Sequence, residues 1–409
     1  MTSHQTIKKI PSDWRNIKMG DLFDFKNGVN ADKASYGYGT RFINVMEVIK
    51  HNSLTAGLIP GMVAVDAKTL TKNSVKYGDV LFNRTSETPE EIGLSSIYLD
   101  NEEVIFGGFV IRARSKTKDL DDRFKKYCFS SSEVRGEIIK RGQGAVRSNI
   151  GQEDLRDVYI LIPPVDEQAR IVTVLEAWDS AIEKLSKKID LKKMVQDGLC
   201  QQLLHGKIRL RNFSKQWNLS RLADLFNERK EIGRGDLPLL SIAARKGIIY
   251  QANSYKKDSS NTDKSKYKRI CPGDIGYNTM RMWQGRSALS KHDGIVSPAY
   301  TVVSPRKDVD PLFFAYLFKT PRLIHSFYQN SQGIVSDTLN CKYKDFKLVK
   351  CPVPAYEEQV AIGKILALAE EELEILERKL KALKSQKKFL LNNLVTGKIR
   401  TTEFIKVNP

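Results

Sequence analysis

Apolar residues recur at alternating steps of four and three along two long segments of the chain. The first series is Ile171, Leu175, Trp178, Ile182, Leu185 and Ile189, and the second is Ile362, Leu366, Ala369, Leu373, Leu376, Leu380, Leu383, Leu390 and Leu394. This spacing, with Glu and Lys around it, is the a/d pattern of a coiled coil, and only Lys387 interrupts it. The pattern predicts two helices, each roughly 55–60 Å long at about 1.5 Å per residue. We expect them to pack antiparallel, because each follows its own globular segment.

The two helical segments belong to a sequence that the chain contains twice without a gap. Ten positions between Pro163 and Phe213 recur 191 residues later, so that Gln168 matches Gln359. Both copies begin with proline and a Glu-Gln pair and end in Gly-Lys-Ile-Arg. Glycine at such a position is typical of a helix C-terminus, because it tolerates positive φ. A duplication with so long a period indicates two homologous halves and not a repeat array.

The residues before each helix predict two α+β globular blocks. The first block has β-like runs at Arg41–Val45, Val80–Phe82, Ser96–Leu99 and Phe109–Arg112. A helical stretch at Arg123–Ile139 and a return strand at Asp157–Ile162 follow. The second block repeats the motifs Trp, Asp-Leu-Phe, Gly-Asp and Gln-Gly at offsets between 189 and 203. The blocks therefore differ by insertions and deletions, as recognition loops on a constant scaffold do. The predicted segments are residues 1–162 (block), 163–209 (helix), 210–352 (block) and 353–409 (helix).

Composition makes nucleic acid the leading partner. The formal net charge is +19 and the pI is near 9.5, so that polyanions are attracted at long range. A membrane surface is the competing partner, but the basic residues are spread along the chain and no apolar run approaches the ~20 residues of a membrane span. Residues 1–12 lack a secretory apolar region, and the five scattered cysteines predict reduced thiols. We expect no membrane location and no metal site, since the five histidines do not cluster.

The helical segment between the two globular blocks carries Pro163-Pro164, Glu167-Gln168 and Gly206-Lys207-Ile208-Arg209, and the same motifs recur after the second block. In this order of blocks and motifs the chain resembles the specificity subunit of a type I restriction–modification system. The resemblance covers nearly the whole chain. It implies two target recognition domains in a pseudo-twofold arrangement, joined by two long antiparallel coiled-coil helices. Each domain would contact half of a split site in double-stranded DNA.

The resemblance also implies partners and a location. Two modification (methyltransferase) subunits would dock on the helices and bring S-adenosylmethionine, restriction subunits could join them, and the complex would be cytoplasmic in a prokaryote. The implied partner-binding residues on the helix surfaces are Glu167, Gln168, Arg170, Glu358 and Gln359. Val360 and Ala361 stand where the first copy has Ala169 and Arg170, so the two docking surfaces need not be equivalent.

No motif for catalysis or for a cofactor is found in the chain. Pro163-Pro164 lacks the preceding Asn or Asp and the following aromatic residue of an amino-methyltransferase loop. The patterns G-x-G-x-x-G, P-loop, H-E-x-x-H and G-x-S-x-G are absent. We therefore predict a non-catalytic DNA-binding subunit without its own cofactor. Two alternatives remain: a self-contained DNA-modifying enzyme, which would transfer methyl groups alone, and a coiled-coil adaptor that does not bind DNA.

Candidate DNA-binding residues fall into two classes, those that contact phosphates and those that contact base edges. The densest basic patch, interleaved with Tyr, Ser and Asn, is predicted to contact phosphates through Lys256, Lys257, Lys266, Lys268 and Arg269. Base contacts need Arg, Asn, Gln, Lys or Ser on short loops. The predicted residues are Arg84, Thr85, Ser86, Gln143, Arg147 and Asn149 in the first half, and Arg281, Arg286, Gln332 and Ser336 in the second. Asn83 and Asn278 recur in both halves, so we expect them to shape the turns instead.

Overall fold

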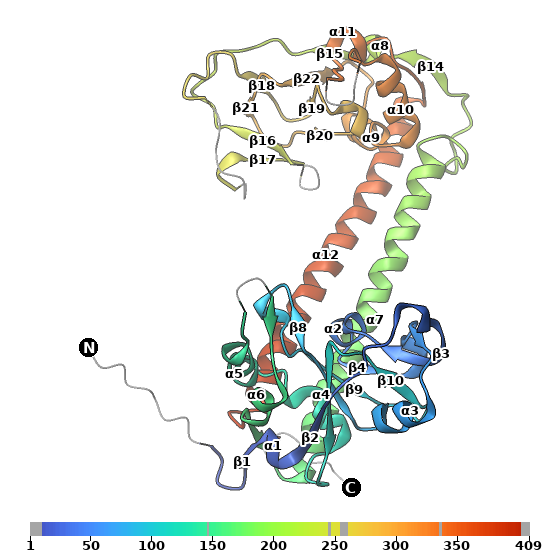
Figure 1. Cartoon of the computed structure of the whole chain (residues 1–409). Coiled ribbons are helices and arrows are strands. Elements are labelled where there is room, and N and C mark those ends of the chain that lie inside the picture. Colours follow the sequence, from blue (N-terminus) through green and yellow to red (C-terminus); the bar gives the residue numbers. More distant parts are fainter. Residues whose placement is uncertain (1–9, 145–146, 244–246, 254–260, 335–337, 402–409) are drawn as a thin grey trace. The chain divides into compact units, whose positions relative to one another are not determined.

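The computed structural model describes residues 10–144, 147–243, 247–253, 261–334 and 338–401. Contacts divide the chain into two compact units, of which unit 1 comprises Met1–Leu185 and Lys379–Pro409 and unit 2 comprises Ser186–Arg378. Each unit holds one globular domain and parts of both long helices, α7 (Val165–Leu203) and α12 (Tyr356–Leu394) (Figure 1). The segment boundaries predicted at residues 162, 209 and 352 follow the sequence repeat and stay a prediction.

The globular domain of unit 1 is built from small sheets and short helices. Its five-stranded sheet has the order β2 (Phe23–Asn27), β11 (Val110–Ser115), β7 (Val80–Asn83), β9 (Ser95–Tyr98) and β4 (Ser53–Leu54). A four-stranded sheet has the order β5 (Met62–Val63), β3 (Tyr36–Ile43), β10 (Val104–Phe106) and β6 (Ser74–Val75). Two strand pairs complete it, β1 (Arg15–Lys18) with β13 (Tyr159–Ile162) and β8 (Thr85–Ser86) with β12 (Ser148–Asn149). The helices are α1 (Met19–Leu22), α2 (Val45–Lys50), α3 (Ala67–Asn73), α4 (Asp122–Cys128), α5 (Ser132–Arg141) and α6 (Gln152–Arg156).

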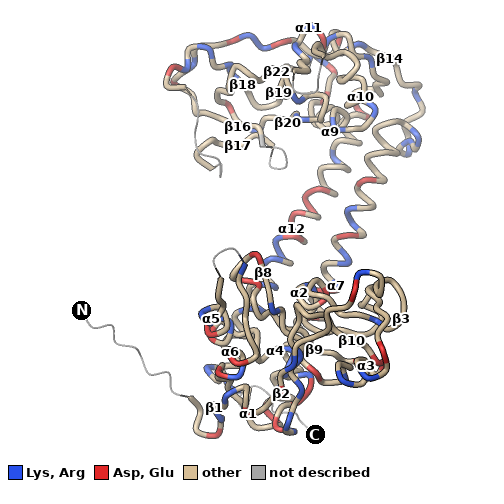
Figure 2. Tube along the Cα trace, in the orientation of Figure 1, with Lys and Arg blue, Asp and Glu red and all other residues tan. Residues whose placement is uncertain are grey.

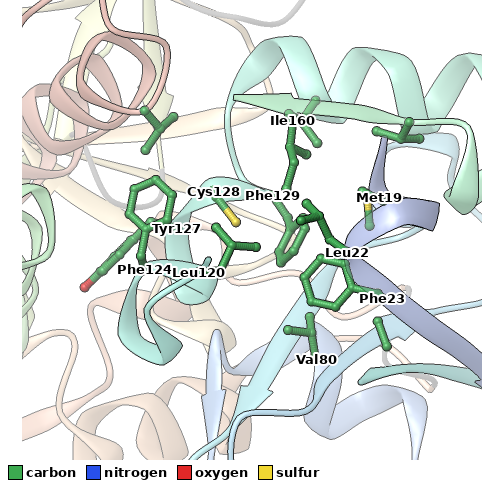
Figure 3. Close-up of a cluster of buried hydrophobic side chains, with 14 of the residues drawn as sticks. Met19, Leu22, Phe23, Val80, Leu120, Phe124, Tyr127, Cys128, Phe129 and Ile160 are labelled. Carbon is green, nitrogen blue, oxygen red and sulfur yellow. The ribbon is translucent and has the colours of Figure 1, made fainter. Parts of the chain in front are cut away.

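Two local predictions for this domain need correction. The helical stretch expected at Arg123–Ile139 is two helices, α4 and α5, because Ser131 begins a new helix by accepting a hydrogen bond from the Val134 N–H at 3.2 Å. Val45, expected at the end of a strand, is the first residue of α2 instead. The core that joins the sheet to these helices gathers Phe23, Val80, Phe124, Phe129 and their neighbours (Figure 3).

Unit 2 repeats this plan with fewer strands. A four-stranded sheet has the order β15 (Phe226–Glu228), β22 (Tyr300–Pro305), β19 (Ile275–Asn278) and β20 (Ser287–Leu289). The strand pairs are β14 (Asn218–Arg221) with β23 (Lys350–Val353), β16 (Leu240–Ala243) with β17 (Gly247–Tyr250), and β18 (Lys268–Ile270) with β21 (Gly294–Val296). The helices are α8 (Leu222–Leu225), α9 (Pro311–Leu317), α10 (Pro321–Asn330) and α11 (Tyr343–Phe346). Its core is aromatic and includes Phe226, Phe314 and Phe346.

The repeated Gly-Asp motif has the same structural task in both units. Gly78 and Gly273 have φ of +84° and +89°, a conformation that side chains disfavour. Each following aspartate is buried and accepts hydrogen bonds from both the Nε and a terminal nitrogen of an arginine, Asp79 from Arg114 and Asp274 from Arg229. The motif therefore fixes the turn before the strands β7 and β19.

Segments of α7 and α12 pack side by side and antiparallel within each unit. In unit 1, Glu167 contacts Arg400 and Asp179 contacts Lys387, so the partner number falls as the first number rises. In unit 2, Lys192 pairs with Glu372 at 2.7 Å. Ile171 and Leu175 of the predicted seam are buried in the core of unit 1, and Ile362 and Leu366 in that of unit 2. The predicted α+β class with two long antiparallel helices is confirmed.

Candidate DNA interface and helix junctions

The base-contact candidates of the first half lie in or beside the strand pair β8–β12 in unit 1. Thr85 lies opposite Asn149 in this pair, and the Thr85 hydroxyl donates to Asn149 Oδ1 over 2.7 Å. Gln143 and Asn149 exchange backbone hydrogen bonds of 2.9 and 2.7 Å. Arg84 precedes Thr85 directly and is half-buried. Loops that are 60 residues apart in the sequence thus form one polar surface.

The two remaining candidates of the first half differ in exposure. Arg147 is exposed and forms a salt bridge of 3.3 Å with Glu87, whose side chain is also exposed. Ser86 is buried, and its hydroxyl donates to Glu91 Oε2 at 3.0 Å. Because that hydroxyl is used inside the turn, we correct the prediction that Ser86 contacts a base.

In unit 2 the corresponding candidates also come together. Arg281 and Arg286 are exposed and flank a short 3₁₀ helix, and the backbone N–H of Arg286 donates to the Arg281 carbonyl at 3.3 Å. Gln332 exchanges backbone hydrogen bonds of 2.9 and 2.8 Å with Asn340, and its side-chain amide donates to Asp345 at 3.5 Å. Ser336 lies outside the described residues.

The predicted phosphate-binding patch consists of residues with different surroundings. Lys266 is exposed, whereas Lys268 donates to the Tyr300 carbonyl at 2.7 Å, and its burial lowers the pKa of its ammonium group. Arg269 forms ion pairs with Asp293 at 2.9 Å and Glu231 at 3.0 Å. Arg269 is therefore already paired within the unit, and its predicted phosphate contact stays a prediction. Lys256 and Lys257 lie outside the described residues.

A common backbone framework holds the candidate loops of both units. The Arg84 N–H donates to the Phe109 carbonyl at 2.9 Å, and the Thr279 N–H donates to the Ala299 carbonyl at 3.2 Å. The Arg84 and Thr279 carbonyls each accept from a residue of the return segment, at 3.0 and 2.8 Å. The Gln143–Asn149 and Gln332–Asn340 pairs complete the match. The units therefore present different side chains from equivalent backbone positions.

The recurring asparagines belong to this framework. Asn83 Oδ1 accepts from the Thr85 N–H at 3.2 Å, and Asn278 Oδ1 accepts from the Met280 N–H at 3.0 Å. Each hydrogen bond closes a turn between the asparagine side chain and the backbone two residues later, as asparagine typically does. Their predicted role in shaping the turns is confirmed.

A second repeated site lies where the end of one long helix segment meets the start of the other, and we call it the helix junction. In unit 1, Glu167 accepts hydrogen bonds from Arg400 at 2.8 Å and from the Trp14 indole N–H at 2.9 Å. In unit 2, Glu358 accepts two from Arg209 at 2.7 Å each and one from the Trp217 indole at 3.2 Å.

The glutamines that follow these glutamates anchor each domain to its helix. Gln168 accepts from the Asp121 N–H and donates to the Asp119 carbonyl, both at 2.8 Å. Gln359 accepts from the Asp310 N–H at 2.9 Å. Both glutamines are almost fully buried, which satisfies their amides inside the unit.

These contacts correct the predicted partner-binding residues. Glu167, Gln168, Glu358 and Gln359 are at most 2% exposed and point into their own unit, so they do not form a helix surface for another protein. Only Arg170 of the five is partly exposed, and its Nε donates to the Thr401 hydroxyl at 3.3 Å. The internal duplication identified these positions as recurring in both halves, but it did not show on which side of the helix their side chains lie.

The junction partners were missed although the sequence held a signal for them. Trp14 and Trp217 recur as a matched pair, and so do Arg209 and Arg400 in the Gly-Lys-Ile-Arg motif. Burial raises the pKa of Glu167, but its hydrogen bonds from Arg400 and Trp14 outweigh that effect and leave the pKa lowered. The ionised carboxylate is thus the state that the junction stabilises.

A family model described as the type I restriction modification DNA specificity domain matches residues 11–193 and 214–385. The chain belongs to this type I DNA specificity family. The two matches fall on the two halves that the internal duplication delimits. The family role is DNA target recognition and not catalysis, so the chain is a specificity subunit, as the sequence predicted.

Relatives of this specificity subunit match it over nearly the whole chain or over about half of it. The Methanocaldococcus jannaschii protein assigned as the type I restriction enzyme MjaX specificity subunit is 24% identical, over 96% of this chain and 95% of its own. The Escherichia coli type I restriction enzyme EcoKI specificity subunit is 23% identical, over 51% of this chain and 47% of its own. The crystal structure of a type I restriction–modification S subunit from M. genitalium has a TM-score of 0.55 at 16% identity, covering 96% of this chain and 98% of that chain. The fold is therefore the fold of these subunits.

The long helices of the specificity subunit also expose apolar side chains. Leu191, Met194 and Val195 lie on one face of α7 and are 63%, 70% and 56% exposed, while Leu368 and Ile375 are exposed on α12. Within the described ranges no helix is long and apolar enough to cross a membrane. Among the same residues, no three or more His, Cys, Asp or Glu side chains are grouped so that they could hold a metal ion.

Proposed function

We propose that this specificity subunit recognises a bipartite target in double-stranded DNA, with one half-site contacted by each unit. One observation carries the proposal, namely that the backbone framework around the candidate loops is the same in both units while its side chains differ. Arg84 in unit 1 corresponds to Thr279 in unit 2, and each is fixed by hydrogen bonds through both its N–H and its carbonyl. Because specificity depends on which side chains face the base edges, equivalent positions with different residues suit two different half-sites.

We further propose that two modification subunits dock on the long helices, and that restriction subunits can join them. The exposed apolar face of Leu191, Met194 and Val195 supports this role, since such a patch on a charged helix marks an interaction surface. Lys, Arg, Asp and Glu alternate along both long helices (Figure 2). The modification subunits would bring S-adenosylmethionine, as the resemblance to type I specificity subunits implies. The assembly would work in the cytoplasm of a prokaryote.

The proposal is tested by coexpressing the chain with the modification subunit of its cell and mapping the methylated bases in the genome. We expect a split motif, with two specific halves around an unspecific gap of fixed length. A contiguous motif would mean that a single unit contacts bases, and would refute the bipartite reading. The purified chain alone should bind DNA but transfer no methyl group, and transfer by it would favour the self-contained enzyme.

A further inference from the structure

Phe109 stands out on the candidate DNA interface of unit 1. It lies in the turn between β10 and β11, where Phe106, Gly107, Gly108 and Val110 are buried, yet its own side chain is 61% exposed. A single exposed apolar residue is common on protein surfaces and needs no explanation by itself. The position of this one relative to the candidate base contacts is what distinguishes it.

The turn that carries Phe109 is held tightly from several sides. The Gly107 N–H donates to the Ile43 carbonyl and the Gly108 N–H to the Val29 carbonyl, both at 3.0 Å. A Cβ added at Gly108 would lie 2.1 Å from the Asn30 side-chain oxygen, so a larger residue there would have to displace the Asn30 side chain. The ring is thus presented from a fixed backbone, which keeps the ordering entropy of a contact low.

Phe109 is joined directly to Arg84. Its carbonyl accepts from the Arg84 N–H at 2.9 Å, and the Arg84 guanidinium donates back to the Gly108 carbonyl at 3.1 Å. Unit 2 has the same backbone hydrogen bond between Thr279 and Ala299. The two units therefore differ at both members of the pair, Arg84 with Phe109 in one and Thr279 with Ala299 in the other.

We infer that Phe109 is a specificity-determining residue of unit 1, which packs its ring against the methyl group of a thymine next to the base pair that Arg84 contacts. This inference rests on the proposed function. The thymine methyl is the apolar group that base pairs offer in the major groove, and a phenyl ring is one of the side chains suited to it. The Arg84 guanidinium donates to the carbonyl of Gly108, the residue before Phe109, and keeps other N–H groups for a polar base contact. The pair would therefore recognise two neighbouring base pairs together. Ala299, the equivalent residue of unit 2, has no ring and would not make the contact with a thymine methyl.

The test compares wild-type, Phe109→Ala and Tyr77→Ala chains, each assembled with the modification subunit. Tyr77 is a matched control, since it is a half-exposed aromatic residue of the same unit that lies outside this turn. Phe109→Ala should fold normally, because unit 2 carries alanine at the equivalent position of the same framework. Competition binding is measured on duplexes in which each position of the two half-sites is varied in turn.

We expect Phe109→Ala to lose about fourfold preference for thymine at one position of one half-site, with all preferences in the other half unchanged. Replacing that thymine by deoxyuridine, which lacks the methyl group, should weaken wild-type and Tyr77→Ala binding by the same factor and leave Phe109→Ala unaffected. Unchanged preferences in Phe109→Ala, an equal loss on every sequence, or a failure to bind the modification subunit would each overturn the inference. A wild-type complex without a split target would overturn the proposed function as well, which separates the two failures.

Discussion

At the scale of single residues, a basic side chain held by two carboxylates of its own unit should contribute less to DNA binding than an exposed one. Lys266 and Arg269 illustrate the contrast, because one is exposed and the other lies between Asp293 and Glu231. We expect Lys266→Ala to weaken binding to all sequences alike and to reduce the slope of log K against log salt by about one unit. Binding isotherms on specific and random duplexes at several salt concentrations measure both quantities.

Arg269→Ala is the matched control for that prediction. It should lower the stability of unit 2 slightly, because two carboxylates lose their partner. The salt slope should stay near that of the wild type. A larger change of slope in Arg269→Ala than in Lys266→Ala would contradict the assignment of these two residues.

The helix junctions allow a second comparison between matched residues. Arg400 contacts both Glu167 and Asp13, with the nearest Asp13 oxygen at 2.6 Å, whereas Glu358 is the only carboxylate paired with Arg209 among the described residues. Glu358→Gln should therefore destabilise its unit by about 1.5–3 kcal/mol, and Glu167→Gln by less. Hydrogen exchange in the first turns of α7 and α12 reports each unit separately. The double variant Asp13→Asn/Glu167→Gln should bring unit 1 to the loss seen in Glu358→Gln, and a single variant that already does so would argue against the shared role of Asp13.

The sequence allowed part of the candidate site to be predicted. Short loops of Arg, Asn and Gln after recurring motifs identified the region where Arg84, Thr85, Gln143 and Asn149 meet. It could not identify Ser86 as buried or Arg269 as paired, because both depend on which distant residues the fold brings near. Local composition carries no information on such partners.

At the scale of elements, Lys387 explains the one gap in the apolar seam. It forms an ion pair with Asp179, which also accepts a 2.7 Å hydrogen bond from the Tyr127 hydroxyl. The heptad pattern predicted both helices because apolar periodicity survives such an exception. The break between α4 and α5 was not predicted, because Ser131 lies within an otherwise helical run and caps only in the folded backbone.

The Asp179 cluster makes the stability of unit 1 depend on pH. Burial raises the pKa of Asp179, but hydrogen bonds from Lys387 and Tyr127 outweigh it, so the folded-state pKa lies below the ordinary value of 3.8. A carboxylate with a depressed pKa stabilises the fold above its unfolded pKa, and this contribution is lost as the pH falls through the folded pKa. Denaturation at pH values from 6 down to about 2 should show a smaller decline for Asp179→Asn than for the wild type. Asp190→Asn, an exposed position of the same helix, should follow the wild type.

The seam itself can be tested by a double-mutant cycle. Lys387→Leu restores the apolar pattern but leaves Asp179 without its main cation, and we expect a net loss of about 1–3 kcal/mol in unfolding free energy. Asp179→Ala/Lys387→Leu should recover most of it, since replacing both members of a partly buried pair by apolar groups is often neutral. If the double variant lost the sum of the stabilities lost by Asp179→Ala and Lys387→Leu alone, the coupling between these residues would be disproved.

The exposed face of α7 is where a docking prediction belongs. Met194→Glu places a charge in the centre of the patch with Leu191 and Val195, which are exposed in the isolated chain. Co-purification of the modification subunit should fall by a factor of ten or more, about 1.4 kcal/mol, while DNA affinity of the chain is kept. Gln196→Glu also introduces a negative charge on α7, but its helix-face neighbours do not include the patch residues, and it should leave co-purification within about twofold of the wild type.

At the scale of the whole molecule, each unit holds its candidate loops with the same backbone hydrogen bonds, but the side chains on those loops differ between the units. Its net charge of +19 favours DNA of any sequence, so that preference must come from a few loop residues. The candidate residues for the two halves lie in separate compact units. This separation predicts that the halves of the target can be altered independently.

A double variant tests that independence in full. Arg84→Ala should relax preference at one base pair of one half-site, and Arg281→Ala at one base pair of the other, each by about 1–3 kcal/mol. Among the described residues the two arginines have no common hydrogen-bond or ion-pair partner. The free-energy changes in Arg84→Ala/Arg281→Ala should therefore add to within about 0.5 kcal/mol on a target altered in both halves. Competition binding with targets changed in one half, the other half or both provides the numbers. An interaction energy above that limit would show that the two units sense each other when DNA binds, and the proposal of independent half-sites would then have to be abandoned.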